Sequence, residues 1–208
     1  EGYNPKHDDP NYVDKKTGKA PVVRKTIENA LKTVWASVWN IRAWDEREHY
    51  GINHAEVKMA MAVSPGYSEL ANGVGVSKNF MNPELGEGVY LNIQSGEDAV
   101  TNPDPAITPD QVLVLFKADP VAKTKYTLKY FKFSSKTQTK PVLEYSEVEK
   151  IVDNLRTLHN HFYKLYHPLN DNPNFSLDVE FKVDDVDVTG KSDGVRRVYY
   201  KQARPFGG

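Results

Sequence analysis

The sequence predicts an α+β fold, in which an antiparallel sheet with β-hairpins packs with two long amphipathic helices. Two observations support this class. Apolar residues recur every three or four positions in two long stretches, which is typical of helices with one buried face. The strand-like segments are separated mostly by turn residues and not by regularly alternating helices, so hairpins are expected in place of repeated βαβ units.

Residues 1–21 are polar, contain three prolines and show no periodic apolar pattern, so they are expected to form an arm. The remaining residues, 22–208, are interpreted as one domain. This domain begins with a predicted helix at residues 22–50, with a possible break near Asn40 and an end at Gly51. Six apolar residues give the helix an apolar face. They are Ile27, Leu31, Val34, Trp35, Val38 and Ile41.

Several strand-like segments follow this helix. Residues 56–64 alternate in part between apolar and polar side chains, which predicts a strand. Residues 73–78 and 88–94 are two further strand candidates, and the turn-forming residues 82–86 between them predict a β-hairpin. Further strands are predicted at residues 111–117 and 127–133, after a proline-rich loop at residues 101–109.

The second long helix is predicted at residues 146–167. Ser146 is a suitable N-cap, and Glu149 three residues later completes the pattern of a capping box. Pro168 is expected to end the helix. Its apolar face consists of Val148, Ile151, Val152, Leu155, Leu158, Phe162 and Leu165.

Composition excludes several classes of protein. The charges are nearly balanced, with a formal net charge of -1, whereas nucleic-acid binders usually carry a basic excess. No apolar run is long enough to predict a membrane span. The absence of cysteine excludes disulfides, zinc–thiolate sites and a thiol nucleophile. The sequence begins with Glu1, not with methionine, so it is expected to be a piece of a longer protein.

The C-terminal residues predict a hairpin. Residues 174–183 alternate strictly, with Phe175, Leu177, Val179, Phe181 and Val183 on one face and Ser176, Asp178, Glu180 and Lys182 on the other. Residues 195–205 are the expected partner strand, and residues 189–194 the turn. The partner strand is expected to carry Val198, Tyr200, Gln202 and Arg204 on one face.

The expected register brings polar side chains together. Residue numbers of directly opposed positions in an antiparallel pair have a constant sum, which is about 382 for a turn centred on Lys191. This register places Glu180 opposite Gln202, and Asp178 opposite Arg204. A carboxylate, an amide oxygen and a guanidinium group then lie on one face of the sheet.

That group of side chains suits a site for ATP and magnesium. Mg²⁺ prefers oxygen ligands and shares them with substrate phosphates, and Glu180 and Gln202 provide such oxygens. Arg204 could bind phosphate oxygens. The alternative is a surface hairpin with a polar solvent face, in which Asp178 and Arg204 form an exposed ion pair of little energetic consequence.

Two motifs strengthen the first interpretation. DVEFK (residues 178–182) and YYKQARPF (residues 199–206) together resemble the end of the nucleotide-binding domain in phosphoenolpyruvate synthase and pyruvate phosphate dikinase. Earlier segments are also similar to this family. They are residues 30–54 (ALKTVWASVWNIRAWDEREHYGINH), residues 71–79 (ANGVGVSKN) and residues 92–105 (NIQSGEDAVTNPDP).

The resemblance implies an ATP-grasp-like fold and the MgATP-binding part of a cytoplasmic phosphotransferase. It implies that Glu180 and Gln202 bind the metal and that Arg204 binds phosphate and acts in catalysis. Glu97, in the Gly96–Asp98 cluster that could begin a helix, is a further candidate for nucleotide binding. Met61 and Val63 are candidates because their segment resembles the one that holds adenine in relatives.

The resemblance also implies partners. The sequence shows no match to the family's N-terminal half, which holds the phosphates with a Lys and an Arg, or to its phosphohistidine domain. The chain is therefore expected to be the C-terminal half of the nucleotide-binding domain, inactive without those parts and without nucleic-acid or membrane partners. Two alternatives remain open: a degenerate ATP-grasp module with a binding or scaffolding role, and a dikinase with another acceptor, such as a glucan or an antibiotic hydroxyl.

Overall fold

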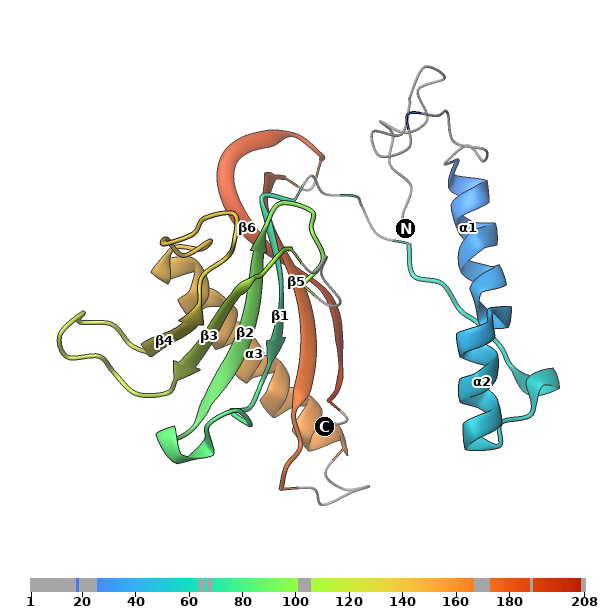
Figure 1. Ribbon diagram of the computed structural model, residues 1–208, viewed down its shortest axis with the longest axis horizontal. Helices are drawn as coiled ribbons and strands as arrows, with labels where there is room; N and C mark the ends of the chain where they lie inside the picture. Colours follow the sequence, from blue (N-terminus) through green and yellow to red (C-terminus); the bar gives the residue numbers. More distant parts are fainter. Residues whose placement is uncertain are drawn as a thin grey trace. The chain divides into compact units, whose positions relative to one another are not determined.

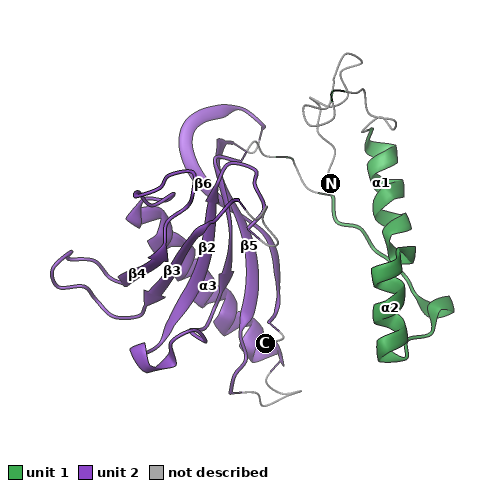
Figure 2. Ribbon diagram, in the orientation of Figure 1, with its two compact units in different colours: residues 1–66 green, residues 67–208 purple. Residues whose placement is uncertain are grey.

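The computed structural model describes residues 18, 26–63, 66, 69–100, 106–166, 173–187 and 189–206. The chain divides into two compact units, residues 1–66 and residues 67–208 (Figure 2). Apart from Gly18, the predicted N-terminal arm lies outside the described residues, as does Pro168. No helix among the described residues is long and apolar enough to cross a membrane.

In unit 1, the structure has two helices where one helix was predicted at residues 22–50. α1 (Ile27–Ala36) and α2 (Ile41–Tyr50) are separated by the 3₁₀ turn η2 (Ser37–Trp39). Asn40 has an extended backbone, and its side chain accepts a hydrogen bond of 2.8 Å from Ala43 N, which caps α2. Gly51 ends α2 in the left-handed conformation. The predicted break and end are confirmed, whereas a single long helix is wrong.

The apolar face predicted for this helix does not form a core. No residue of α1 is buried, and Trp35 and Trp39 are each 56% exposed. The buried residue of α2 is Arg47, which donates to Val38 O at 2.6 Å and to His54 Nδ1 at 2.9 Å. Two ten-residue helices provide too little apolar surface for a separate core.

The strand predicted at residues 56–64 is also wrong. The 3₁₀ turn η3 (His54–Glu56) precedes residues 57–63, which have no regular secondary structure. Partial alternation predicts a strand only where another strand can satisfy its backbone hydrogen-bonding groups. The described part of unit 1 contains no strand that could pair with this segment.

Unit 2 contains a six-stranded antiparallel sheet in the order β4-β3-β2-β1-β5-β6 (Figure 1). The first four strands form a meander, α3 follows, and β5 returns to pair with β1. The predicted α+β class and its antiparallel hairpins are therefore confirmed. The elements are β1 (Ala71–Val76), η4 (Pro83–Leu85), β2 (Gly88–Ser95), β3 (Asp110–Leu115), β4 (Thr127–Lys132), α3 (Tyr145–Tyr166), β5 (Leu177–Val186) and β6 (Ser192–Pro205).

Helix α3 covers one face of the sheet and forms the core with it (Figure 1). The helix begins slightly before the predicted position, because Glu147 Oε2 accepts a hydrogen bond from Glu144 N at 2.9 Å. This bond is one half of a capping box, with Glu144 and Glu147 at the positions predicted for Ser146 and Glu149. The buried core residues are Ala71, Val89, Leu91, Ile93, Val112, Val114, Tyr126, Leu143, Val148, Ile151, Val152, Leu155, Leu177, Val179, Phe181 and Val183.

His159 connects α3 to the end of the sheet. Its Nδ1 lies 2.9 Å from Ser77 Oγ, and this oxygen also accepts a hydrogen bond from Leu177 N. The imidazole is stacked parallel to the Tyr163 ring. Burial, together with the nearby charge of Lys78, lowers the pKa of His159 below its usual 6.5. The folded protein therefore favours the neutral imidazole.

This pKa predicts how stability depends on pH. Below about pH 6.5 the unfolded chain takes up a proton at His159 that the folded chain resists, so the free energy of unfolding falls as the pH falls. We expect His159→Gln to remove part of this dependence, as measured by urea unfolding between about pH 5 and pH 8. His161→Gln is the control, because His161 is exposed on the same helix. An unchanged pH dependence in His159→Gln would contradict the prediction.

Candidate functional site

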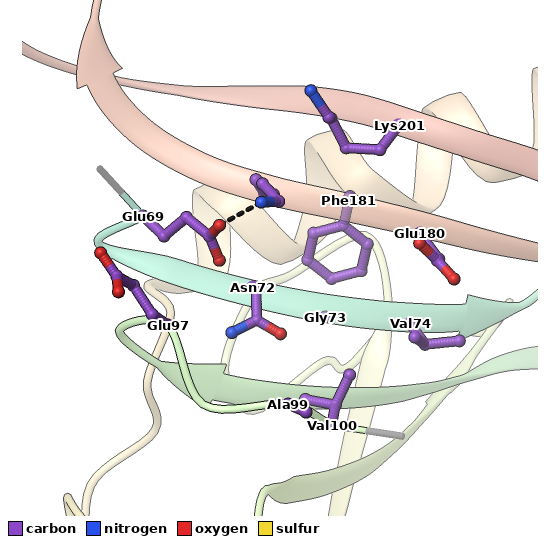
Figure 3. A pocket seen from close by; sticks show the side chains of 11 residues that line it. Glu69, Asn72, Gly73, Val74, Glu97, Ala99, Val100, Glu180, Phe181 and Lys201 are labelled. Atoms are coloured by element: carbon purple, nitrogen blue, oxygen red, sulfur yellow. Dashed lines mark hydrogen bonds and ion pairs between the residues drawn. The ribbon is translucent and has the colours of Figure 1, made fainter. Parts of the chain in front are cut away.

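A cleft of about 240 Å³ lies over β1 and β5 (Figure 3). It opens on the side of these strands that points away from α3, which we call the polar face. Side chains alternate along β5, so Asp178, Glu180 and Lys182 occupy the polar face while their neighbours enter the core. Glu180 and Lys182 line the cleft, together with Asn72 of β1.

The predicted pairing at the end of the C-terminal hairpin is confirmed. Glu180 lies opposite Gln202, and Asp178 lies opposite Arg204. The turn differs from the prediction, because Val186 pairs with Ser192, and the tip is centred near Thr189. Two irregularities between the tip and Glu180 add residues on β6 and restore the expected register.

One irregularity changes the expected face of two residues. Glu180 pairs with Gln202, but Phe181 pairs with Tyr200, so β6 contains Lys201 as an additional residue between these pairs. Such a β-bulge shifts the alternation of side chains along the strand. Val198 and Tyr200 therefore pack against the core instead of sharing a face with Gln202 and Arg204.

Four oxygen-bearing side chains lie in one row across the polar face. They are Gln202 on β6, Glu180 on β5, Asn92 on β2 and Gln111 on β3, and the apolar Val74 of β1 stands between Glu180 and Asn92. Asn92 Oδ1 is buried and accepts no hydrogen bond from the described residues. Buried acceptors usually have a partner. This row can therefore bind a donor group, a water molecule or a cation.

Arg204 lies in the next row, at Asp178. Arg204 Nη2 and Nε donate to Asp178 Oδ2 at 2.8 and 3.1 Å, and the guanidinium side chain is 58% exposed. The other oxygen, Asp178 Oδ1, is buried without a hydrogen bond from the described residues. Neither Arg204 nor Gln202 lines the cleft itself. The hairpin thus brings Glu180, Gln202 and Arg204 onto one face and places only Glu180 at the cleft.

Glu97 lies at the edge of the cleft, in the turn after β2. No helix begins there, so the expected helix N-terminus is wrong. Asn72 Nδ2 holds this turn by donating to Gly96 O at 2.7 Å and to Asp98 O at 2.9 Å. These two hydrogen bonds therefore hold the turn against β1 at the cleft.

Met61 and Val63 belong to unit 1, whereas the cleft lies in unit 2. Met61 is half-buried, and Val63 is 73% exposed in a segment without regular structure. Their contact with adenine stays a prediction.

Three charged residues of the cleft were not predicted as site residues, namely Glu69, Lys182 and Lys201. Lys182 forms an ion pair with Glu69 across the cleft wall, and Lys201 lines the cleft from β6 (Figure 3). The alternation in residues 174–183 already placed Lys182 on the same face as Glu180. Nothing in the sequence pattern placed Lys201 there, because its position depends on the bulge.

Carboxylate, amide and ammonium groups surround the cleft on this open sheet face, and a concave site with a few polar groups is where a ligand is expected to bind. The family model described as "Pyruvate phosphate dikinase, AMP/ATP-binding domain" matches residues 15–207. The chain belongs to this family, as the motifs at residues 178–182 and 199–206 predicted. It is an ATP-binding domain of the dikinase type. No curated protein and no solved structure gives a significant match.

The floor of the cleft gives a test of the packing. A Cβ atom at Gly73 would collide with the Phe181 ring and would lie 2.7 Å from Asn92 O. We expect Gly73→Ala to lower the free energy of unfolding by about 1–3 kcal/mol, as overpacked substitutions do, when measured by urea denaturation. Gly66→Ala is the matched control, because nothing lies within 4 Å of its added Cβ. Equal stability of the two variants would show that β1 can move away from Phe181.

Proposed function

We propose that this domain binds MgATP at the polar face and serves a phosphotransferase of the phosphoenolpyruvate synthase (pyruvate, water dikinase) or pyruvate phosphate dikinase kind. The observation that supports the proposal most directly is the β5–β6 register, which sets Glu180 against Gln202 beside the cleft. The family of the chain supports ATP as the nucleotide.

Glu180 and Gln202 are the proposed metal ligands. Their side chains offer a carboxylate and an amide oxygen, and Asp178 Oδ1 nearby is a buried acceptor without a hydrogen bond from the described residues. This donor set fits Mg²⁺, which would neutralise phosphate charge when bound. The described residues contain no cluster of three or more His, Cys, Asp or Glu side chains suited to a metal. Phosphate oxygens and water are therefore expected to complete the coordination, as is usual for Mg²⁺.

Arg204 is the proposed phosphate-binding and catalytic residue. Its guanidinium is largely exposed on the polar face and uses only part of its donor fork on Asp178. A phosphate group on this face can accept from the remaining N–H groups. Arg204 would then offset negative charge on the transferred phosphoryl group.

The remaining residues, Glu97, Met61 and Val63, are proposed to contact the nucleotide. Glu97 is placed at the edge of the cleft by the turn that Asn72 holds, where its carboxylate could accept from a ligand hydroxyl or amino group. Met61 and Val63 are proposed to contact adenine, on the basis of their family segment alone.

Complete activity is proposed to need other parts of the same protein. These are an N-terminal half with phosphate-holding Lys and Arg residues, and a domain with a phosphorylated histidine that passes the phosphoryl group toward pyruvate. This domain alone is expected to be inactive. Another acceptor remains an alternative, because acceptor choice belongs to those other parts.

A degenerate binding or scaffolding module is the second candidate. The observation that favours it is the ion pair between Arg204 and Asp178, which occupies two of the polar-face groups with each other. In such a module the hairpin would have only a structural role.

Calorimetric titration of MgATP into the complete gene product separates these candidates. We expect Glu180→Ala and Gln202→Ala to weaken binding by about 10- to 100-fold, because each removes a contact to a charged ligand, and Glu180→Ala to abolish ATP turnover. Glu149→Ala is the matched control, since Glu149 lies on α3 behind the opposite face. Full turnover in Glu180→Ala would refute the metal role, and absence of MgATP binding by the unaltered protein would favour the scaffolding module.

A further inference from the structure

We propose that strand β4 is a docking site for an acidic, extended segment of another protein, which adds a further strand to the sheet. In this partner, acidic side chains alternate with apolar ones. The inference does not depend on nucleotide binding, because β4 lies at the opposite edge of the sheet from β6, which carries Gln202 and Arg204.

The outer edge of β4 offers the backbone groups that such a strand needs. Among the described strands, β4 pairs with β3 alone, and it comes first in the order of the sheet (Figure 1). Alternate residues of an edge strand direct their N–H and C=O groups outward, where another strand can pair with them. The pairing with β3 is regular from Thr127 to Tyr130. An added strand can therefore continue the sheet at these residues.

The charge of this edge favours an acidic partner. Residues 117–140 contain seven lysines and one acidic residue, a formal charge of +6 in a chain whose total is -1. All seven lysines are exposed. Lys125 forms an ion pair with Asp153. Lys136 forms one with Asp98. The others form no ion pair with a described residue, and they are Lys117, Lys123, Lys129, Lys132 and Lys140. A positive patch of this kind attracts a segment of opposite charge.

The side chains of β4 determine the pattern of the partner. Leu128 and Tyr130 pack against the core, so Lys129 between them points to the polar face. Lys132 lies opposite Gln111, which is on the same face. In a strand beside β4, alternate side chains would lie next to these two ammonium groups, and the intervening ones next to Leu128 and Tyr130. Acidic side chains suit the first set of positions, and apolar side chains suit the second.

The same lysines disfavour two other partners. A second copy of β4 would bring like charges together, which opposes pairing between the edges of two copies. A nucleic acid offers negative charge but has no polypeptide backbone to pair with the outer edge of β4. An acidic polypeptide segment uses both the charges and the backbone groups, so it is the partner that this edge fits.

Fluorescence anisotropy with a labelled peptide tests the inference. The probe is a short synthetic peptide in which glutamate and valine alternate, titrated with the complete gene product at about 0.1 M salt, where the Debye length is about 10 Å. We expect this peptide to bind. We expect Lys129→Glu combined with Lys132→Glu to weaken binding about 10- to 100-fold, because like charges then lie side by side. Unchanged binding by this variant would overturn the inference.

The matched control is Lys150→Glu combined with Lys164→Glu. Both lysines are exposed on α3, so the net charge changes by the same amount away from β4. This control should bind the alternating peptide within about threefold of the unaltered protein, which is less than about 0.7 kcal/mol. A loss equal to that of the β4 variant would overturn the inference, since it would show that net charge alone controls binding.

Two further probes separate strand addition from attraction of charge alone. A peptide of the same composition, in which all glutamates precede all valines, should bind at least about 10-fold more weakly, because its acidic and apolar side chains do not alternate. A single-stranded oligothymidylate of similar charge should bind no better than this second peptide. Equal binding of the two peptides, tighter binding of the oligonucleotide, or no binding of the alternating peptide would overturn the inference.

Hydrogen exchange on the unaltered protein covers the case in which the β4 variant does not fold. Pairing with an added strand protects the outward amide groups of β4. Exchange in residues 127–132 should therefore slow at saturation with the alternating peptide, while exchange in α3 stays the same. Unchanged exchange in β4 with the peptide bound would overturn the inference, because the peptide would then bind elsewhere.

Discussion

The pairing of β5 with both of its neighbours is the constraint on which the polar face depends. β5 lies between β1 and β6, and its alternate residues pack against α3. A slip of one residue would exchange the faces, which would bury Glu180 and expose Phe181. Such a slip is opposed by the transfer free energy of the large apolar side chains, about 1.5–3 kcal/mol for each one that is fully buried. The core thus determines where the charged groups point.

Close contact between β1 and the layer beneath it strengthens this constraint. Gly73 pairs with Phe181 and leaves room for its ring, while a Cβ at Gly75 would lie 2.7 Å from a methyl group of Leu155. Larger side chains here would separate the sheet from α3. Gly73 also lines the cleft. The strand that needs a glycine for packing against Phe181 therefore also forms part of the floor of the cleft.

Much of unit 2 was predictable from sequence, because its strands alternate clearly and its helix has a clear apolar stripe. The pairing of Glu180 with Gln202 was also predicted, although the turn and the pairing of the residues between the turn and Glu180 differ from the prediction. A regular ladder from the observed tip near Thr189 would pair Glu180 with Val198, and irregularities on β6 shift this partner to Gln202. Bulges depend on tertiary contacts, so the position of Lys201 was not predictable. The strand predicted at residues 56–64 is wrong for a related reason, since alternation does not show whether a partner strand exists.

Two ion pairs near the cleft, Arg204 with Asp178 and Lys182 with Glu69, differ in what a ligand must displace. Exposed pairs contribute about 0–1 kcal/mol, and Arg204 is exposed enough to belong to this group. A phosphate that accepts a charge-assisted hydrogen bond from Arg204, at about 1.5–3 kcal/mol, can therefore compete with Asp178. Lys182 and Glu69 are more shielded from water than Arg204, so their pair is harder to separate. The pairing of Arg204 with Asp178 thus keeps the guanidinium oriented on the polar face without excluding a phosphate, whereas the pairing of Lys182 with Glu69 favours a fixed wall of the cleft.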